Sequence, residues 1–382
     1  DSWPGPIWER MGVPGFNAVN LSLFSLAEGH RNRQASKGLV RLMWDAHGRG
    51  SGIEKGVLER FAPGQQTIVY PATALGSELD SIDLAKLQAR RTRLYVNLEQ
   101  WLQKLRESGA AVDWGVWRRT FLESLKENFR ATVAETRRPM NDITLFDQTV
   151  ASVAMLKAAL AQNLVMGWKE PIQAAVADKY QWRFLRVAIS GPTFWGSAAR
   201  LSDMLARRAL IVEALNRVEA LLEETYPLGM EVYRDENGSL FIVPDIDSVL
   251  DLPAEDRSLR SHLIQIAETA LDGEARFTLE LSQPTRNMLM LGQLATRALP
   301  DPTSTSEWLA QIWRKTLPND ICPVCGLRPQ GPGDKAAERK VCNTCEQRRA
   351  DRSKKWAADL RTTIWTDEVA DINSRFALIV GA

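Results

Sequence analysis

The sequence has few of the residues on which acid–base catalysis most often depends. It contains three histidines, His30, His47 and His262, among 382 residues. None of them is followed by aspartate, no two form a His-x3-His pair, and none lies in a recognisable nucleophile motif. The sequence therefore gives no argument for a catalytic triad, and we assign no catalytic residue.

Long apolar runs and an excess of one charge are also missing. No run approaches the roughly 18 apolar residues that a membrane-spanning helix needs, and no basic region followed by an apolar stretch marks a signal peptide. Lys and Arg number 48 and Asp and Glu 47, so the net charge of +1 creates no global field toward nucleic acid or lipid. We expect no membrane partner and a cytoplasmic location.

Cysteine is scarce and confined to one short region, Cys322, Cys325, Cys342 and Cys345. Two Cys-x2-Cys pairs separated by sixteen residues have the spacing of a zinc site, because each pair can bind the metal from one tight turn. Four thiolates leave no open position for water, so the predicted zinc is structural. Two disulfides, a rubredoxin-like iron site and a redox-active thiol pair remain alternatives. Such sparse cysteine usage is typical of a reducing cytoplasm.

Apolar periodicity predicts helices before residue 180 and a mixed unit after it. Leu94, Leu98, Trp101 and Leu105 recur at helical spacing in the first part. The mixed unit begins with an alternating strand at 184–190, followed by a helix at about 197–224.

Two strands then follow at 230–234 and 240–243, and Asn237-Gly238 between them is a strong hairpin signal. A second helix at 254–272, ended by Gly273, and a strand at 275–281 complete the series. The order β-α-β-β-α-β is that of the ferredoxin-like split motif and of palm domains.

The predicted fold class is α+β, with a helical N-terminal domain, a ferredoxin-like (βαββαβ) palm domain and a four-cysteine zinc module. We divide the chain into an irregular region (1–80), a helical domain (81–180), the palm (181–300), the zinc module with a basic helix (301–366) and the opening strand of a second palm (367–382). Because the sequence starts at Asp1 and stops in an apolar β-branched run, we expect a fragment of a larger protein.

Two weaker candidate sites accompany the cysteines. Asp235 and Glu236 stand in the hairpin turn, where catalytic palms hold carboxylates for two metal ions and a nucleoside triphosphate. The first strand ends in Ser190 rather than aspartate, so a structural turn is the competing interpretation. After the second cysteine pair, a basic stretch is either a solvated helix face or a nucleic-acid contact; its residues are Arg348, Arg349, Arg352, Lys354 and Lys355.

Four segments together resemble one family, the large signature subunit of type III CRISPR effector complexes. They are 141–147 (NDITLFD), 231–238 (EVYRDENG), 338–342 (ERKVC) and 365–373 (WTDEVADIN), and their order along the chain also fits. The resemblance covers roughly residues 115–382.

The resemblance implies a subunit that caps an RNA-guided complex near the 5′ end of the crRNA. It implies crRNA and target RNA, repeat-fold backbone subunits and a small subunit as partners. It further implies cyclic oligoadenylate synthesis from ATP and Mg²⁺ in a second palm, of which this chain would hold only the opening strand. The palm described above resembles the family's degenerate copy.

The chain departs from the family pattern at two places. Gln148 stands where relatives often have histidine, so we do not expect HD nuclease activity, and the Gly-Gly-Asp-Asp turn of a catalytic palm is absent from the sequence. Two alternatives from other classes stay open. One is a stand-alone nucleotide cyclase or polymerase-like enzyme that uses Asp235 and Glu236, and the other is a zinc-dependent nucleic-acid adaptor.

Overall fold

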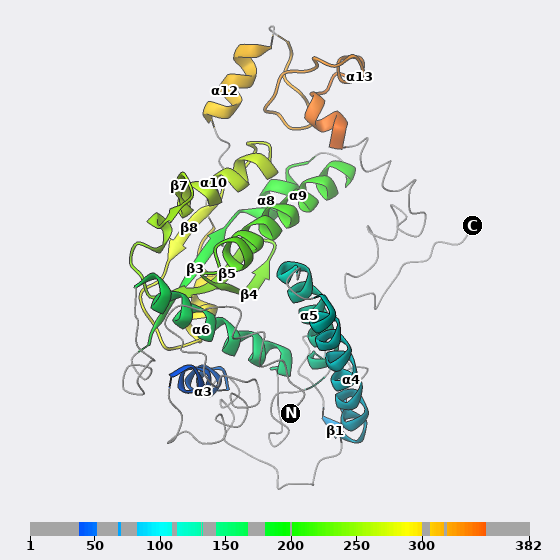
Figure 1. Cartoon of the computed structure of the whole chain (residues 1–382). Coiled ribbons are helices and arrows are strands. Elements are labelled where there is room, and N and C mark those ends of the chain that lie inside the picture. The colour runs from blue at the N-terminus through cyan, green and yellow to red at the C-terminus, as the bar shows by residue number, and fades with distance from the viewer. Residues whose placement is uncertain are drawn as a thin grey trace, which may run out of the picture.

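A computed structural model of the chain is drawn in Figure 1. The structure describes residues 38–51, 68–69, 82–108, 113–130, 132, 143–166, 180–198, 201–299, 306–316 and 319–348. The fold is α+β, as the sequence predicts. A four-stranded sheet lies at its centre, with helices on both faces.

The central sheet consists of β3 (Trp182–Ala188), β4 (Met230–Asp235), β5 (Gly238–Pro244) and β8 (Thr278–Leu281). The strand order is β4-β5-β3-β8, and every neighbouring pair is antiparallel. The strands fall close to the predicted segments, although β3 begins and ends two residues earlier than expected.

The predicted hairpin joins β4 to β5 through Glu236 and Asn237, and Asp235 pairs with Gly238. Gly238 has a φ of 131°, and a Cβ at this position would lie 2.0 Å from the carbonyl oxygen of Val187. The turn therefore needs glycine both for its backbone conformation and for its close approach to β3.

One face of the sheet is covered by α9 (Leu201–Ala220) and α10 (Leu259–Ala270). A π-helical turn, Leu221–Thr225, continues α9. The predicted second helix begins later than expected, because residues 253–258 form a small hairpin of β6 (Pro253–Ala254) and β7 (Arg257–Ser258). The buried core between sheet and helices includes Leu185, Val187, Leu215, Val218, Phe241, Leu263 and Ala267.

The opposite face of the sheet is covered by α6 (Leu145–Val165) and by α11 (Met290–Ala295). Thr144 caps α6, and its hydroxyl accepts from the backbone of Asp147 while the Asp147 carboxylate accepts from the backbone of Thr144. Small side chains let α6 approach the strands closely. The buried residues of this interface include Ala151, Ala154, Met155, Ala158, Trp182, Phe184 and Ile242. We call the sheet with α6, α9 and α10 the sheet unit.

The helix α6 lies in the segment predicted as a helical domain (81–180), and it shares a core with the sheet. A correction concerns the region 1–80, which we expected to be irregular. Within it, α3 (Gly38–Gly50) is a helix that packs on α6, with Leu42 and Ala46 buried. The short strand β1 (Ile68–Val69) pairs antiparallel with β2 (Ile82–Asp83). Apart from these elements and Ser51, residues 1–80 lie outside the described part of the chain.

A helical pair, α4 (Leu84–Ser108) and α5 (Trp114–Phe129), lies beside the sheet unit (Figure 1). The two helices meet through Trp101 and Phe121, whose ring centroids are 5.8 Å apart. Arg119 of α5 pairs with Glu224 of the π-helical turn at 2.9 Å, and Arg118 pairs with Glu223. The predicted helical character of this segment is confirmed.

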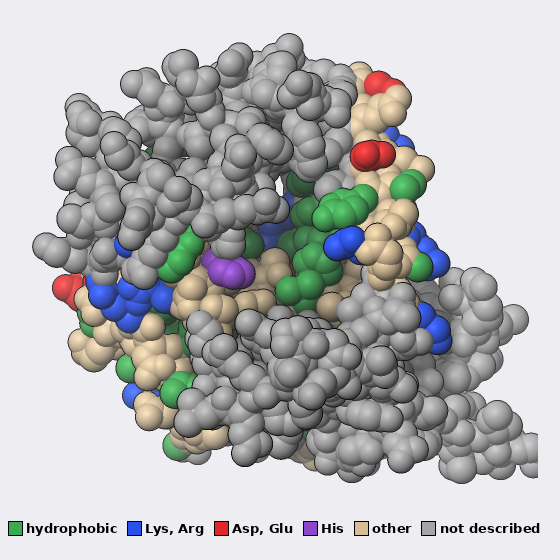
Figure 2. Space-filling model, turned by 90° about the horizontal axis from the view of Figure 1, so that it is seen from below, with side chains coloured by type: hydrophobic (Ala, Val, Ile, Leu, Met, Phe, Trp, Pro, Cys, Tyr) green, Lys and Arg blue, Asp and Glu red, His purple; other side chains and the backbone are tan. Residues whose placement is uncertain are grey.

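The remaining elements are short. They are α8 (Gly191–Gly196), a 3-10 turn (Val249–Asp251), α12 (Ser306–Lys315) and α13 (Asp334–Glu338). The last two lie at the end of the molecule opposite α3 (Figure 1). The face seen in Figure 2 shows hydrophobic side chains near the centre of its described part, with Lys and Arg mostly toward the margins. Among the described helices, none combines the length and apolar character that crossing a membrane requires.

Candidate metal centre

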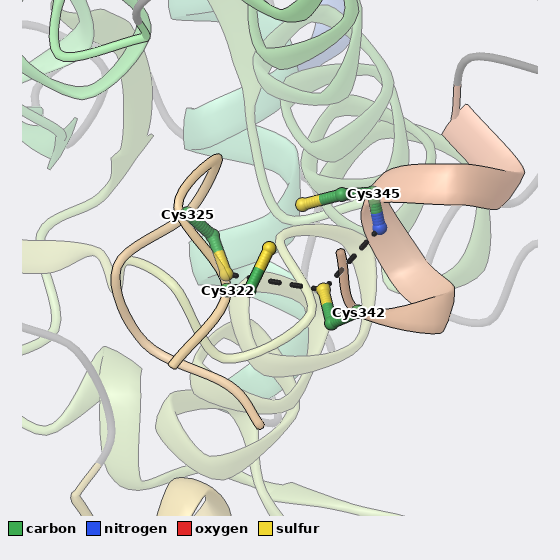
Figure 3. A group of neighbouring side chains, drawn as sticks. All are labelled: Cys322, Cys325, Cys342 and Cys345. Atoms are coloured by element: carbon green, nitrogen blue, oxygen red, sulfur yellow. Dashed lines mark hydrogen bonds between the residues drawn. The ribbon is translucent and has the colours of Figure 1, made fainter. Parts of the chain in front are cut away.

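The first cysteine pair lies in a tight turn that the backbone closes. The N–H of Gly326 donates to the carbonyl of Cys322 at 2.8 Å, and Gly326 has a φ of 64°. A left-handed residue directly after the second cysteine is most easily supplied by glycine. The sequence Cys-Pro-Val-Cys-Gly thus folds both thiols toward the same side of the turn (Figure 3).

The second pair begins a helical turn at residues 343–348. Lys340, at a φ of 55°, reverses the chain just before Val341 and Cys342. The N–H of Cys345 points at the sulfur of Cys342, at 3.5 Å. We call residues 319–348, which carry both pairs, the cysteine module.

The four sulfur atoms lie together, all within 4.8 Å of one another. Cys325 and Cys342 have their sulfurs 3.9 Å apart, and none of the four cysteines is in a disulfide. Tetrahedral zinc with Zn–S bonds of about 2.3 Å places its sulfurs about 3.8 Å apart. The four cysteines can therefore bind a metal such as zinc, and the two disulfides considered from the sequence are absent from the structure.

The protonation of the thiols follows from their mutual contact. Hydrogen bonds from Cys342 and Cys345, together with backbone N–H groups of Leu327 and Arg328, lower the pKa of Cys325. The hydrogen bond with Cys325 raises the pKa of Cys342 to about 12, and the same contact also raises that of Cys345. A metal that binds all four sulfurs must displace these protons.

The apolar core of the module is small. Its buried residues, apart from three of the cysteines, are Ala336 and Val341, with Val324 packed against them. A core of this size contributes little stabilisation, so a bound metal would be the main interaction that orders the module.

Asp235 and Glu236 are not brought together into a metal site. One oxygen of Asp235 accepts from the N–H of Asn237 at 2.7 Å and the other accepts from the Tyr233 hydroxyl at 3.1 Å. Glu236 instead pairs with Arg208 of α9 at 3.0 Å. In the described part of the chain, no group of three metal-ligating side chains includes either carboxylate.

The predicted basic stretch is described only at its first residue. Arg348 has a side chain that is 11% exposed, and it pairs with Asp272 and Glu274, each at 2.8 Å. Its charge is thus directed into the protein, which corrects the expectation of a nucleic-acid contact for this residue. The other four, Arg349, Arg352, Lys354 and Lys355, lie outside the described residues.

Sequence reasoning missed the residues that surround the cysteines. Arg328 and Glu274 pair at 2.5 Å although 54 positions separate them, and both side chains are at most 3% exposed. No local pattern indicates such a pair. An arginine three residues after Cys325, within an otherwise uncharged turn, is the nearest signal.

In comparisons with known proteins, no family model matches the chain, and no curated protein matches it.

Proposed function

We propose that this chain is a subunit of an RNA-guided antiviral ribonucleoprotein, the type III CRISPR effector complex. The observation that supports it most is the order of two units along the chain. A sheet unit with strands β4-β5-β3-β8 is followed, after α11 and α12, by a four-cysteine module that contacts it through the ion pair of Arg328 and Glu274. The elements β3, α9, β4, β5, α10 and β8 follow one another as in a split βαβ motif. We infer that the sheet unit is a ferredoxin-like palm domain.

We further propose that this palm supports a second, catalytic palm and catalyses no reaction itself. The turn where a catalytic palm presents its carboxylates here uses Asp235 to order its own backbone and pairs Glu236 with Arg208. Ser190, where the first strand would supply another carboxylate, instead precedes α8. ATP and Mg²⁺ would then act in a second palm that makes cyclic oligoadenylate. Its expected opening strand, 367–382, lies outside the described residues.

The proposed partners are the crRNA and its target RNA, repeat-fold backbone subunits and a small subunit, in the cytoplasm. The chain would contribute scaffolding near the 5′ end of the crRNA. The cysteine module would hold a structural zinc, because four sulfurs within 4.8 Å of one another could complete the coordination of the metal.

Co-expression with its genomic neighbours and affinity purification test this proposal. We expect RNA of one uniform length and repeat-fold subunits to co-purify with the tagged chain. A matched control is a variant with Asp235→Ala and Glu236→Ala, which should retain the same RNA and subunits because these carboxylates have no assembly role in the proposal.

Recovery of a monomer without RNA would overturn the effector-complex proposal. ATP turnover by this chain alone, lost in the double alanine variant, would instead establish the stand-alone nucleotide enzyme. Salt-sensitive nucleic-acid binding without any partner protein would establish the adaptor function.

A further inference from the structure

The loop that follows α10, Asp272-Gly273-Glu274, lies between the sheet unit and the cysteine module. Gly273 has a φ of 67°, and its N–H donates to the carbonyl of Glu268 at 2.9 Å, which ends the helix. A Cβ on Gly273 would lie 2.4 Å from the ring of Trp308, so glycine lets this ring pack on the loop. The loop is thus a contact surface for the segment that leads to the cysteines.

The backbone of Arg328 lies in the first cysteine turn, and its side chain contacts the loop that follows α10. Its carbonyl accepts from the N–H of Cys322 at 2.7 Å, and its own N–H bonds to the thiol of Cys325. Its guanidinium donates to Glu274 and to the carbonyl of Asp272, both at 2.5 Å, and lies 5.1 Å from the centre of the Trp308 ring. Movement of the cysteine turn therefore moves a group bound to the sheet unit.

Arg348 connects the second cysteine turn to the same loop. It lies three residues after Cys345, and its two terminal nitrogens pair with Asp272 and Glu274 at 2.8 Å each. Glu274 is also 3.5 Å from Arg207 of α9, which belongs to the sheet unit. Both cysteine turns thus converge on one buried carboxylate that the sheet unit holds in place.

We propose that Glu274 is a positioning residue for the metal centre, coupling metal binding at the cysteines to docking of the module on the sheet unit. The proposal rests on the metal part of the proposed function and is independent of assembly with RNA. Glu274 touches no cysteine in this arrangement; it acts through Arg328 and Arg348. Coupling of this kind is reciprocal: the factor by which zinc binding strengthens docking is the factor by which docking strengthens zinc binding.

The test is zinc affinity of the full-length chain, measured by competition with a chromophoric chelator. We expect Glu274→Gln to weaken zinc binding about 10-fold, the lower end of effects seen when partners of metal ligands are changed. Glu280→Gln is the matched control, because Glu280 also pairs with an arginine, Arg186 at 3.0 Å, but on β8 away from the cysteines. Its zinc affinity should stay within about 2-fold of wild type.

Hydrogen exchange at Gly273 and Glu274 provides the reciprocal readout. Their amides should exchange faster once zinc is removed from the wild-type chain. If Glu274→Gln fails to fold, Arg348→Gln replaces it with the same expected loss of affinity. Equal zinc affinity in the Glu274 variant and the control, or unchanged exchange at the loop, overturns the coupling. A wild-type chain that binds no zinc overturns it as well, whatever RNA the chain carries.

Discussion

The sheet unit and the cysteine module are stabilised by different interactions, although they lie against each other. The sheet unit buries large apolar side chains on both faces of its strands, including Phe184 and Phe241, each 0% exposed. The apolar core of the cysteine module contains, besides its cysteines, only the buried side chains of Ala336 and Val341. Hydrophobic burial therefore stabilises the first unit, whereas we propose that the second depends on a metal.

The largest expected effect comes from replacing one of the four cysteines, because this should remove the bound zinc. Cys322→Ser leaves three thiolates, and in small zinc domains metal binding contributes about 10 kcal/mol or more of the folding free energy. We expect bound zinc, measured by elemental analysis, to fall from one equivalent to below about 0.1. Far-UV circular dichroism should still report the helices of the sheet unit. Full zinc retention would contradict the assignment.

A substitution in the core of the sheet unit should lower the stability of that unit and leave the zinc content unchanged. Phe241→Ala removes a fully buried ring and should lower the free energy of unfolding by about 3–5 kcal/mol, measured by urea denaturation. Zinc content should stay at one equivalent. Tyr95→Ala, at a side chain that is 56% exposed, is the control and should change stability by less than about 0.5 kcal/mol. A sheet-unit variant that loses zinc and stability together would show that the two units do not differ as described.

Acid should weaken zinc binding by the cysteine module. In the metal-free centre, the raised pKa of Cys342, about 12, and that of Cys345 keep both thiols protonated at neutral pH. Binding must release these protons, so zinc affinity should fall as the pH falls and rise as it increases. Calorimetric titrations in two buffers with different ionisation enthalpies measure the protons released, and we expect at least two. Release of none would contradict the thiol arrangement.

The smallest expected effect comes from the capping residue of α6. Thr144→Ala removes the capping box of α6 and should cost about 1 kcal/mol of unfolding free energy in thermal denaturation. Because α6 shares a core with the strands, the whole sheet unit should unfold at the lower temperature in a single transition. An α6 that melts separately would return it to the independent helical domain that the sequence predicts.

The sequence predicted those features that depend on neighbouring residues. The Asn237-Gly238 turn and the two Cys-x2-Cys pairs were found because a tight turn and a metal ligand pair need particular residues at fixed short spacing. The four sulfurs do lie together. The end of α10 shortly before Gly273 also follows from the backbone freedom of this one residue.

Features that depend on distant residues were missed or misplaced. The helix α3 was expected to be irregular, because its burial comes from α6, about a hundred residues later in the sequence. The two interpretations of Arg348, a solvated helix face or a nucleic-acid contact, came from its basic neighbours, whereas its partners, Asp272 and Glu274, lie more than 70 positions earlier. Charge along a segment does not indicate which charges face solvent and which are paired.

The most direct test of the difference between the two units is hydrogen exchange of the full chain with and without a zinc chelator. We predict that the chelator removes protection from amides in residues 322–348, while those in β3 and β5 keep theirs. Unchanged protection in the cysteine module, or equal loss in β3 and β5, would contradict the proposal that the module depends on a metal and the sheet unit does not.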